Sequence, residues 1–173
     1  MVATMQENIV IRGMQESDVE KIFQEFESLG WNPKRSTYEK YYQEYIEQKR
    51  YVFIAEYQGE VAGYTTMLKK AEGGPFNGMY PEVKDFNVFP RFRKKGIGNR
   101  ILDAAEAAAG DISDTITLAV GMHSGYGAAQ RIYVKRGYIP DGTGVWYQEK
   151  VLGEYEACRN DDDLNLYFSK KLR

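Results

Sequence analysis

The sequence predicts an α/β protein with one mixed sheet of about seven strands and four helices. Alternating apolar stretches, typical of strands, interleave with stretches at helical spacing in the order strand, two helices, three strands, helix, strand, helix, two strands. The 173 residues contain no repeats or linkers. A chain of this length can bury about 70% of its unfolded surface in one core. We therefore expect a single domain over residues 1–173.

The first two elements are a strand and a helix. Residues 8–12 have the pattern of a short strand, and Ser17 and Asp18 supply a helix start. Gly30 ends that helix. The apolar residues at helical spacing between these limits are Ile22, Phe23, Phe26 and Leu29.

A second helix and a hairpin follow. Residues 37–48 form an amphipathic helix whose apolar side is Tyr38, Tyr41, Tyr42, Tyr45 and Ile46. Strands over 51–57 and 61–68 flank the turn pair Gln58 and Gly59. We expect the tyrosines to form a packed face.

The most informative stretch covers residues 83–102. Pro90 cannot donate to a sheet ladder and holds the preceding residue extended, so a strand over about 83–89 ends there. Helical spacing then predicts a helix from about Gly96 to Gly110. The first amides of a helix have no partner within it and lie at the positive end of its dipole, which favours a phosphate. This stretch predicts an anion site.

Glycine spacing separates this loop from two common phosphate loops. A P-loop has four residues between its glycines and then Gly-Lys-Ser/Thr, and a dinucleotide fingerprint has three glycines, so neither pattern matches. The chain instead has Arg-x-x-Gly-x-Gly at Arg93, Gly96 and Gly98, after Val-x-Pro at residues 88–90. The alternative is a basic turn whose glycines only cap a surface helix.

The remaining elements alternate again. A strand is expected at 115–120, a helix from about Gly127 to a stop at Gly137, and strands at 144–150 and 164–170.

The basic glycine loop resembles the pyrophosphate loop of the GNAT superfamily of N-acetyltransferases, and the order of elements is similar to that superfamily from end to end. This resemblance implies a central mixed, splayed sheet flanked by four helices, with acetyl-CoA as the cofactor and a small-molecule or peptide amine as the acceptor. The residues that it places at the cofactor are Phe86, Val88, Arg93, Lys94, Lys95, Gly96, Ile97, Gly98 and Asn99.

Residues 127–138 resemble the second cofactor segment of the same superfamily, with Tyr133 and Gly137 in register. The resemblance places Tyr133 beside the cofactor sulfur; the alternative is a helix tyrosine packed on the sheet. Many relatives carry asparagine seven positions before this tyrosine, where the present chain has Tyr126. Proton transfer from a phenol of pKa about 10 to a thiolate, whose thiol has a pKa of about 8.5, is energetically unfavourable. We therefore expect Tyr133 to donate a hydrogen bond to the departing sulfur.

Acetyl transfer to an amine also requires a base. An amine with a pKa of about 10.4 must lose a proton at neutral pH, which a carboxylate can accept directly or through water. The resemblance favours Glu82, fourteen residues before Gly96, with Asp85 on the same strand as the second candidate. Strand alternation places these two on opposite faces unless a bulge intervenes. Each could instead be an ordinary exposed carboxylate.

Charge and composition limit the partners. A net charge of −2 argues against nucleic acid. The five basic side chains within residues 91–100 suit one phosphorylated cofactor. The acidic residues 154–163 form either a solvated loop or a surface that steers a cationic amine. No apolar run approaches the roughly 20 residues of a membrane helix. We expect no membrane partner and a cytoplasmic location; the resemblance allows a homodimer.

The residues give less support to covalent catalysis or to a metal site. The single cysteine, Cys158, has acidic neighbours that suppress its thiolate, and without a Cys/His cluster we expect no metal. His123 either touches ligand or is structural. By the resemblance, Trp31, Tyr38 and Tyr42 are candidate acceptor neighbours. We expect an acyltransferase acting by direct attack in a ternary complex; the alternative is a non-catalytic acyl-CoA binding or sensing module.

Overall fold

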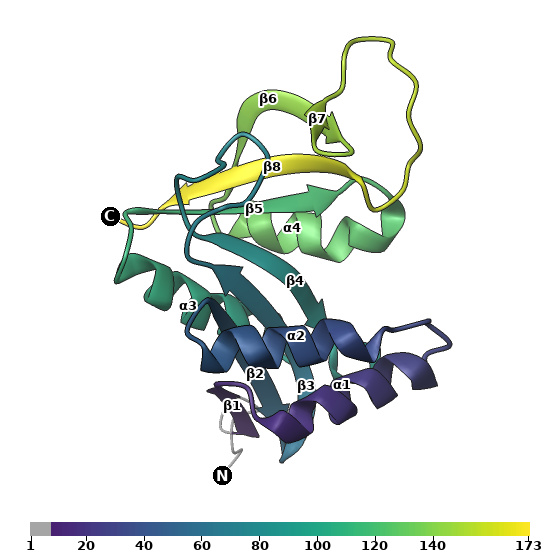
Figure 1. The fold of residues 1–173 in the computed structure, drawn as a ribbon, viewed down its shortest axis with the longest axis vertical. Coiled ribbons are helices and arrows are strands. Elements are labelled where there is room, and N and C mark those ends of the chain that lie inside the picture. Colours follow the sequence, from purple (N-terminus) through teal and green to yellow (C-terminus); the bar gives the residue numbers. More distant parts are fainter. Residues whose placement is uncertain (1–7) are drawn as a thin grey trace. The chain divides into compact units, whose positions relative to one another are not determined.

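The computed structural model describes residues 8–173 (Figure 1). The helices are α1 (Glu16–Ser28), α2 (Arg35–Ile46), α3 (Ile97–Gly110) and α4 (Gly127–Lys135), with short 3-10 turns η2 (Pro90–Phe92) and η3 (Ser124–Tyr126). The strands are β1 (Ile9–Arg12), β2 (Arg50–Tyr57), β3 (Glu60–Leu68), β4 (Glu82–Val88), β5 (Thr115–Gly121), β6 (Ile139–Tyr147), β7 (Lys150–Val151) and β8 (Leu164–Lys171). In this part of the chain the eight strands form one open mixed sheet in the order β1-β2-β3-β4-β5-β8-β6-β7.

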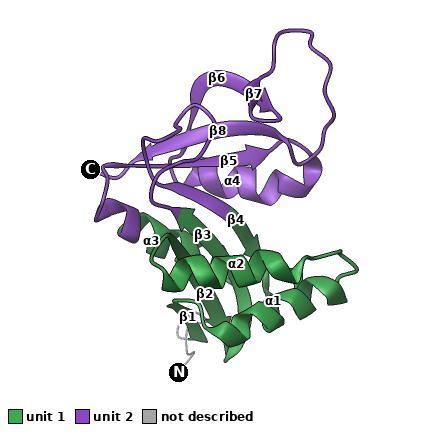
Figure 2. Ribbon diagram, in the orientation of Figure 1, with its two compact units in different colours: residues 1–67, 85–107 green, residues 68–84, 108–173 purple. Residues whose placement is uncertain are grey.

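The chain divides into two compact units (Figure 2). Unit 1 comprises the described residues up to 67 together with 85–107, and unit 2 comprises 68–84 and 108–173. Strand β4 supplies residues to both, because its first three residues belong to unit 2 and the rest to unit 1. A single domain over residues 1–173 stays a prediction.

Unit 1 has an aromatic core. Phe26 of α1 stacks on Trp31 (ring centroids 5.2 Å apart) and meets Phe89 edge to face at 5.2 Å. Such pairs contribute roughly 0.5–1.5 kcal/mol beyond the buried area. The fully buried side chains of this core include Ile22, Ile54, Tyr64, Phe89, Ile97 and Ile101. The α2 tyrosines pack against this core, as predicted for a packed face.

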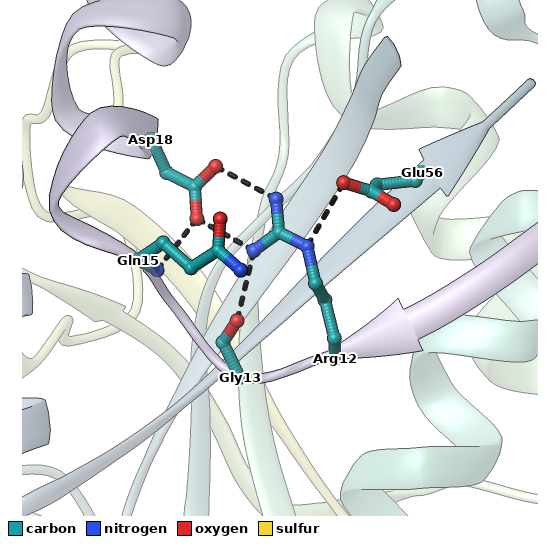
Figure 3. Close-up of polar contacts among 5 residues, drawn as sticks. All are labelled: Arg12, Gly13, Gln15, Asp18 and Glu56. Atoms are coloured by element: carbon teal, nitrogen blue, oxygen red, sulfur yellow. Dashed lines mark hydrogen bonds and ion pairs between the residues drawn. The ribbon is translucent and has the colours of Figure 1, made fainter. Parts of the chain in front are cut away.

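An ion-pair network joins β1, α1 and β2 (Figure 3). Arg12 donates to both carboxylate oxygens of Asp18 at 2.7 and 2.8 Å and to Glu56 at 3.0 Å. Asp18 also accepts the backbone amide of Gln15 (2.7 Å), which satisfies one amide at the start of α1. Asp18 is completely buried. Its bidentate ion pair with the Arg12 guanidinium therefore offsets the cost of removing the carboxylate charge from water. Hydrogen bonding to Asp18 in turn raises the pKa of Arg12 above its usual range.

Unit 2 is centred on β5. The first residues of β4 lie parallel to it, with Glu82 opposite Thr117 and Val83 opposite Leu118. On its other side β5 pairs antiparallel with β8 along its whole length, and β8 pairs with β6. Ile116 and Leu118 on one face of β5 and Thr117 on the other are fully buried, in keeping with a central strand that is covered on both faces.

One predicted strand is wrong. Residues 144–150 do not form a single strand, because Gln148 and Glu149 have φ values of 51° and 64° and make the turn between β6 and β7. Strand β6 begins earlier, at Ile139, and its pairing with β8 shifts register between Pro140 and Val145. The sheet therefore has eight strands among the described residues instead of about seven.

The other predicted elements are confirmed, with boundaries shifted by one or two residues. Gly30 (φ 76°) follows α1, and Gly137 (φ 91°) follows α4. Gln58 and Gly59 both have positive φ, which suits the tight turn between β2 and β3. Helix α2 spans Arg35–Ile46 instead of 37–48.

We predict that Asp18→Asn lowers the free energy of unfolding by about 3 kcal/mol, because Arg12 loses the charge of its main partner in a buried setting. Urea unfolding would measure the difference. Asp111→Asn makes the same chemical change at an exposed position and should shift stability by less than about 0.5 kcal/mol. Equal shifts for the two variants would contradict a stabilising role for the network.

Candidate active site

A loop with left-handed backbone leads into α3. Lys94 has φ 62° and Gly96 has φ 81°. The carbonyl of Gly96 accepts the amide of Arg100 (3.2 Å) and closes the first turn, while Ile97 is buried and anchors the helix start. A Cβ atom on Gly96 would meet no heavy atom within 4 Å. The space beside the Gly96 Cα is thus open, and an anion bound at the first amides of α3 would gain roughly 0.3–2 kcal/mol from the helix dipole.

Two of the five basic side chains within residues 91–100 contact residues that lie far away in the sequence. Arg91 pairs with Glu25 (2.9 Å) and Glu60 (3.3 Å). Arg100 donates to the Ile9 carbonyl (3.4 Å). The concentrated positive charge predicted from sequence is therefore partly neutralised.

The other three basic side chains remain beside the α3 loop. Arg93 is exposed and donates to the Val88 carbonyl (3.3 Å), which ties the loop to the end of β4. The Lys95 ammonium lies 5.2 Å from the centre of the Tyr57 ring, a cation–π contact. Lys94 is exposed. These side chains are available to neutralise a bound phosphate.

The C-terminal half of β4 is held close to β3. A Cβ atom on Gly63 would lie 2.5 Å from the Asn87 carbonyl oxygen and 3.1 Å from Val88 Cα, so only glycine fits. The Phe89 amide donates to the Ala62 carbonyl (2.9 Å) just beyond. Phe86 and Val88, both predicted cofactor residues, are half-buried against the core of unit 1.

Asp85 interrupts β4. Its φ of 55° lies in the left-handed region, which breaks strand alternation as a bulge does. Its carboxylate accepts hydrogen bonds from Tyr41 (3.0 Å), Tyr64 (2.7 Å) and Asn87 (2.7 Å). Burial, aided by the charge of Asp85, raises the pKa of both phenols above the usual range, so they stay protonated donors.

Glu82 lies in a different environment within unit 2. Its side chain is buried and pairs with Lys84 at 3.2 Å. Burial raises the pKa of Glu82, the charge of Lys84 opposes that rise, and the charges of Glu72 and Glu149 reinforce it. A carboxyl group whose pKa is raised toward neutrality is suited to general-base work.

Tyr133 lies on α4 and is only 4% exposed. Burial, followed by the nearby phenol of Tyr126, raises the pKa of Tyr133 above its usual range. Its ring meets that of Tyr138 edge to face at 5.8 Å. Such a phenol holds its proton and can donate a hydrogen bond.

The His123 side chain makes its hydrogen bonds within the fold. Its Nδ1 accepts the amide of Gly125 (3.1 Å), so Nε2 carries the proton toward Asp162 (3.0 Å). Tyr126 also donates to Asp162 (2.9 Å), and hydrogen bonds from His123 and Tyr126 hold the pKa of this carboxyl below its usual value. Cys158 is exposed. Among residues 8–173, no three potential metal ligands lie together.

The predicted site residues divide between the units. Glu82 and Tyr133 belong to unit 2. The residues in unit 1 are Asp85, Phe86, Val88, Arg93, Lys94, Lys95, Gly96, Ile97, Gly98 and Asn99. Sequence reasoning missed the partners of Asp85, because Tyr41 and Tyr64 come from other elements. Asn87, two residues along the same strand, is the one partner that strand alternation could have indicated.

Comparisons with known proteins show the family of this chain and solved structures with a similar fold. The profile of the Acetyltransferase (GNAT) domain matches residues 20–148. An N-acetyltransferase from Staphylococcus aureus Mu50 superposes with a TM-score of 0.70 at 16% identity, covering 96% of this chain and 99% of its own. A Salmonella typhimurium protein described as an acetyltransferase, solved with its cofactor acetyl-CoA, superposes with a TM-score of 0.68 at 16% identity over 96% and 95%.

A third similar structure is a spermidine N-acetyltransferase chimera from Vibrio cholerae and hSSAT, with a TM-score of 0.68 at 14% identity over 95% of this chain and 96% of that one. No curated protein matches at the sequence level. The chain belongs to the GNAT acetyltransferase family, as its glycine motifs predicted. No helix within residues 8–173 is long and apolar enough to cross a membrane.

Proposed function

We propose that this protein is an acetyl-CoA-dependent N-acetyltransferase that transfers an acetyl group to a primary amine by direct attack in a ternary complex. The observation that carries the proposal is the open, left-handed glycine loop before α3 in a chain of the GNAT family. Acetyl-CoA is the cofactor named for one similar structure. When bound, it supplies an acetyl group activated as a thioester.

The α3 loop has the properties needed to bind the cofactor diphosphate. The first amides of α3, at Ile97, Gly98 and Asn99, are proposed to bind the diphosphate, because the start of a helix favours an anion. Arg93 and Lys94 lie beside that space on exposed positions and can add charge–charge attraction. Backbone groups of Phe86 and Val88 are proposed to pair with the extended part of the cofactor.

Glu82 is proposed to accept the proton of the amine. Its raised pKa supports this role, since a base works best when its pKa approaches the working pH. The ammonium group of Lys84, 3.2 Å away, stabilises the charged form of the buried Glu82 carboxylate. Asp85, the second candidate, has three donors on its carboxylate and is treated below.

Tyr133 is proposed to donate a hydrogen bond from Oη to the departing sulfur while keeping its proton. A pKa raised by burial supports a donor over a full acid. The same burial favours the second candidate function, a module that binds acyl-CoA without turnover, because a 4% exposed phenol has little surface for a ligand.

Incubation with acetyl-CoA and a pool of primary amines tests the proposal. We expect release of free thiol that depends on the amine, together with an acceptor mass increased by one acetyl group. Cofactor binding measured by calorimetry, without turnover on any amine, would instead support the binding module. The acceptor, a homodimer and a cytoplasmic location stay predictions.

Gly96→Asn should weaken CoA binding about tenfold, because its side chain fills the open space before α3. Asparagine tolerates the left-handed region, so the fold should persist. Gly30→Asn is the matched control: Gly30 has φ 76° and open space around its Cβ, but lies after α1. Calorimetry with CoA gives the affinities. Equal affinity in both variants would contradict the placement of the diphosphate.

Glu82→Gln should lower kcat/KM by about 100-fold or more, since general bases contribute roughly 10²–10⁴-fold. In the unchanged protein, the rate should rise with pH through the raised pKa of Glu82, because only the ionised form accepts a proton. Lys84→Met removes a charge that lowers this pKa, so the acid limb should move to higher pH. Glu149→Gln should move it to lower pH. An acid limb unmoved by either change would exclude Glu82 as the base.

Tyr133→Phe should reduce turnover about tenfold or more while changing CoA affinity much less, because the lost hydrogen bond forms mainly as the sulfur departs. Tyr138→Phe removes a phenol from the neighbouring buried ring and controls for packing. Steady-state kinetics and calorimetry separate the two effects. Unchanged turnover in Tyr133→Phe would remove its catalytic assignment.

A further inference from the structure

The carboxylate of Asp85 has a neutral set of partners. Tyr41 and Tyr64 donate to Oδ2, and Asn87 donates to Oδ1. A carboxylate offers about four acceptor positions, so these three bonds leave one position, on Oδ1 of an exposed residue. None of the three donors carries a positive charge. The carboxylate is thus fixed in place while its charge stays available to a ligand.

Three aromatic side chains lie close to this charge. The ring of Tyr38 lies 6.3 Å from that of Tyr41 and 6.4 Å from that of Tyr64, both edge to face. Burial, followed by the charge of Asp85, raises the pKa of Tyr38 to about 12. The field of Asp85 is therefore felt by three phenols. A carboxylate next to aromatic rings is the chemistry that recognises an ammonium ion.

The neighbouring cation in unit 1 is committed elsewhere. Arg50 pairs with Glu44 (2.5 Å) and donates to Thr66 (3.0 Å). Its guanidinium lies 5.0 Å from the centre of the Tyr41 ring. Arg50 therefore contacts the Tyr41 ring, whereas the Asp85 carboxylate accepts its hydrogen bonds from the two phenols and the Asn87 amide.

The backbone holds Asp85 in this position. Aspartate tolerates the left-handed region better than most residues, and its φ is 55°. Such a conformation costs of order 1–3 kcal/mol and persists only where the surroundings enforce it. Here the three hydrogen bonds and the close approach of Gly63 to Asn87 enforce it. Strain of this kind concentrates at ligand sites.

We propose that Asp85 binds an ammonium group of the acceptor that is not the nitrogen acetylated, so that the acceptor is a diamine or larger polyamine. This inference rests on the proposed function. An ion pair with a carboxylate favours the protonated form of an amine, and a protonated nitrogen has no electron pair for attack. The nitrogen at Asp85 is therefore bound and kept out of the reaction, while a second, neutral nitrogen of the same molecule reacts.

Two acceptors of equal length test the proposal: 1,4-diaminobutane and 4-amino-1-butanol, in which a hydroxyl replaces the second ammonium. A hydrogen bond to a charged group contributes about 1.5–3 kcal/mol. We therefore expect kcat/KM to favour the diamine by on the order of 10- to 100-fold, after correction for its two equivalent amines. In Asp85→Asn this preference should disappear. Asparagine keeps the shape and tolerates the backbone conformation.

Tyr41→Phe provides a second variant with the charge intact. It removes one donor from Oδ2 and should reduce the preference for the diamine by a smaller factor. Thermal unfolding of each variant checks the fold. An equal loss with both acceptors in Asp85→Asn would overturn the proposal and favour Asp85 as a general base.

Calorimetry with 1,4-diaminobutane in the absence of acetyl-CoA separates the two proposals. Binding that weakens about tenfold or more in Asp85→Asn supports the ammonium site even without turnover. Failure of the unchanged protein to acetylate any amine of the pool, while it still binds 1,4-diaminobutane through Asp85, would count against the proposed function alone. Diamine binding of equal strength in both proteins would overturn the ammonium site.

Discussion

The way strand β4 presents its side chains depends on one backbone feature, the left-handed conformation of Asp85. Before this residue the strand lies parallel to β5 and carries the buried Glu82. After it, Phe86 and Val88 pack on the core of unit 1, and the strand is held against β3 by the close contact at Gly63. Because alternation breaks at Asp85, each half of β4 presents its side chains independently of the other.

The two carboxylates of β4 lie in different environments, which suit them to different proposed roles. Glu82 is buried beside a lysine, and loss of water raises its pKa. Asp85 is exposed and takes hydrogen bonds from two phenols and an amide. A partly desolvated carboxyl is suited to accepting a proton, whereas a fixed, hydrated charge is suited to recognising a cation.

Buried tyrosine hydroxyls recur among the candidate site residues and their neighbours. The pKa values of Tyr38, Tyr41, Tyr64 and Tyr133 are all raised, with burial as the first cause in each case. Burial disfavours the phenolate, so each hydroxyl remains a donor at physiological pH. In unit 1 the hydroxyls of Tyr41 and Tyr64 donate to the Asp85 carboxylate, and in unit 2 Tyr133 is proposed to donate to the leaving group.

Local sequence patterns determined most of the elements and the position of the glycine loop before α3. Pro90 ends a strand, Gly96 opens a helix, and Gly30 and Gly137 end two others, because proline and glycine act through the backbone of their own residues. The predicted strand at 144–150 failed for a related reason. Pro140 and the nearby glycines have the composition of a loop, yet pairing with β8 holds β6 as a strand around a register shift.

Only the tertiary structure decided the chemistry of individual carboxylates. The sequence placed Glu82 and Asp85 three residues apart on one strand, but not the burial of the first or the three hydrogen bonds of the second. Tyr41 and Tyr64 come from α2 and β3, 44 and 21 residues from Asp85 along the chain. Periodicity determines which face of an element a residue occupies, whereas desolvation and hydrogen bonding depend on what the rest of the chain brings to that face.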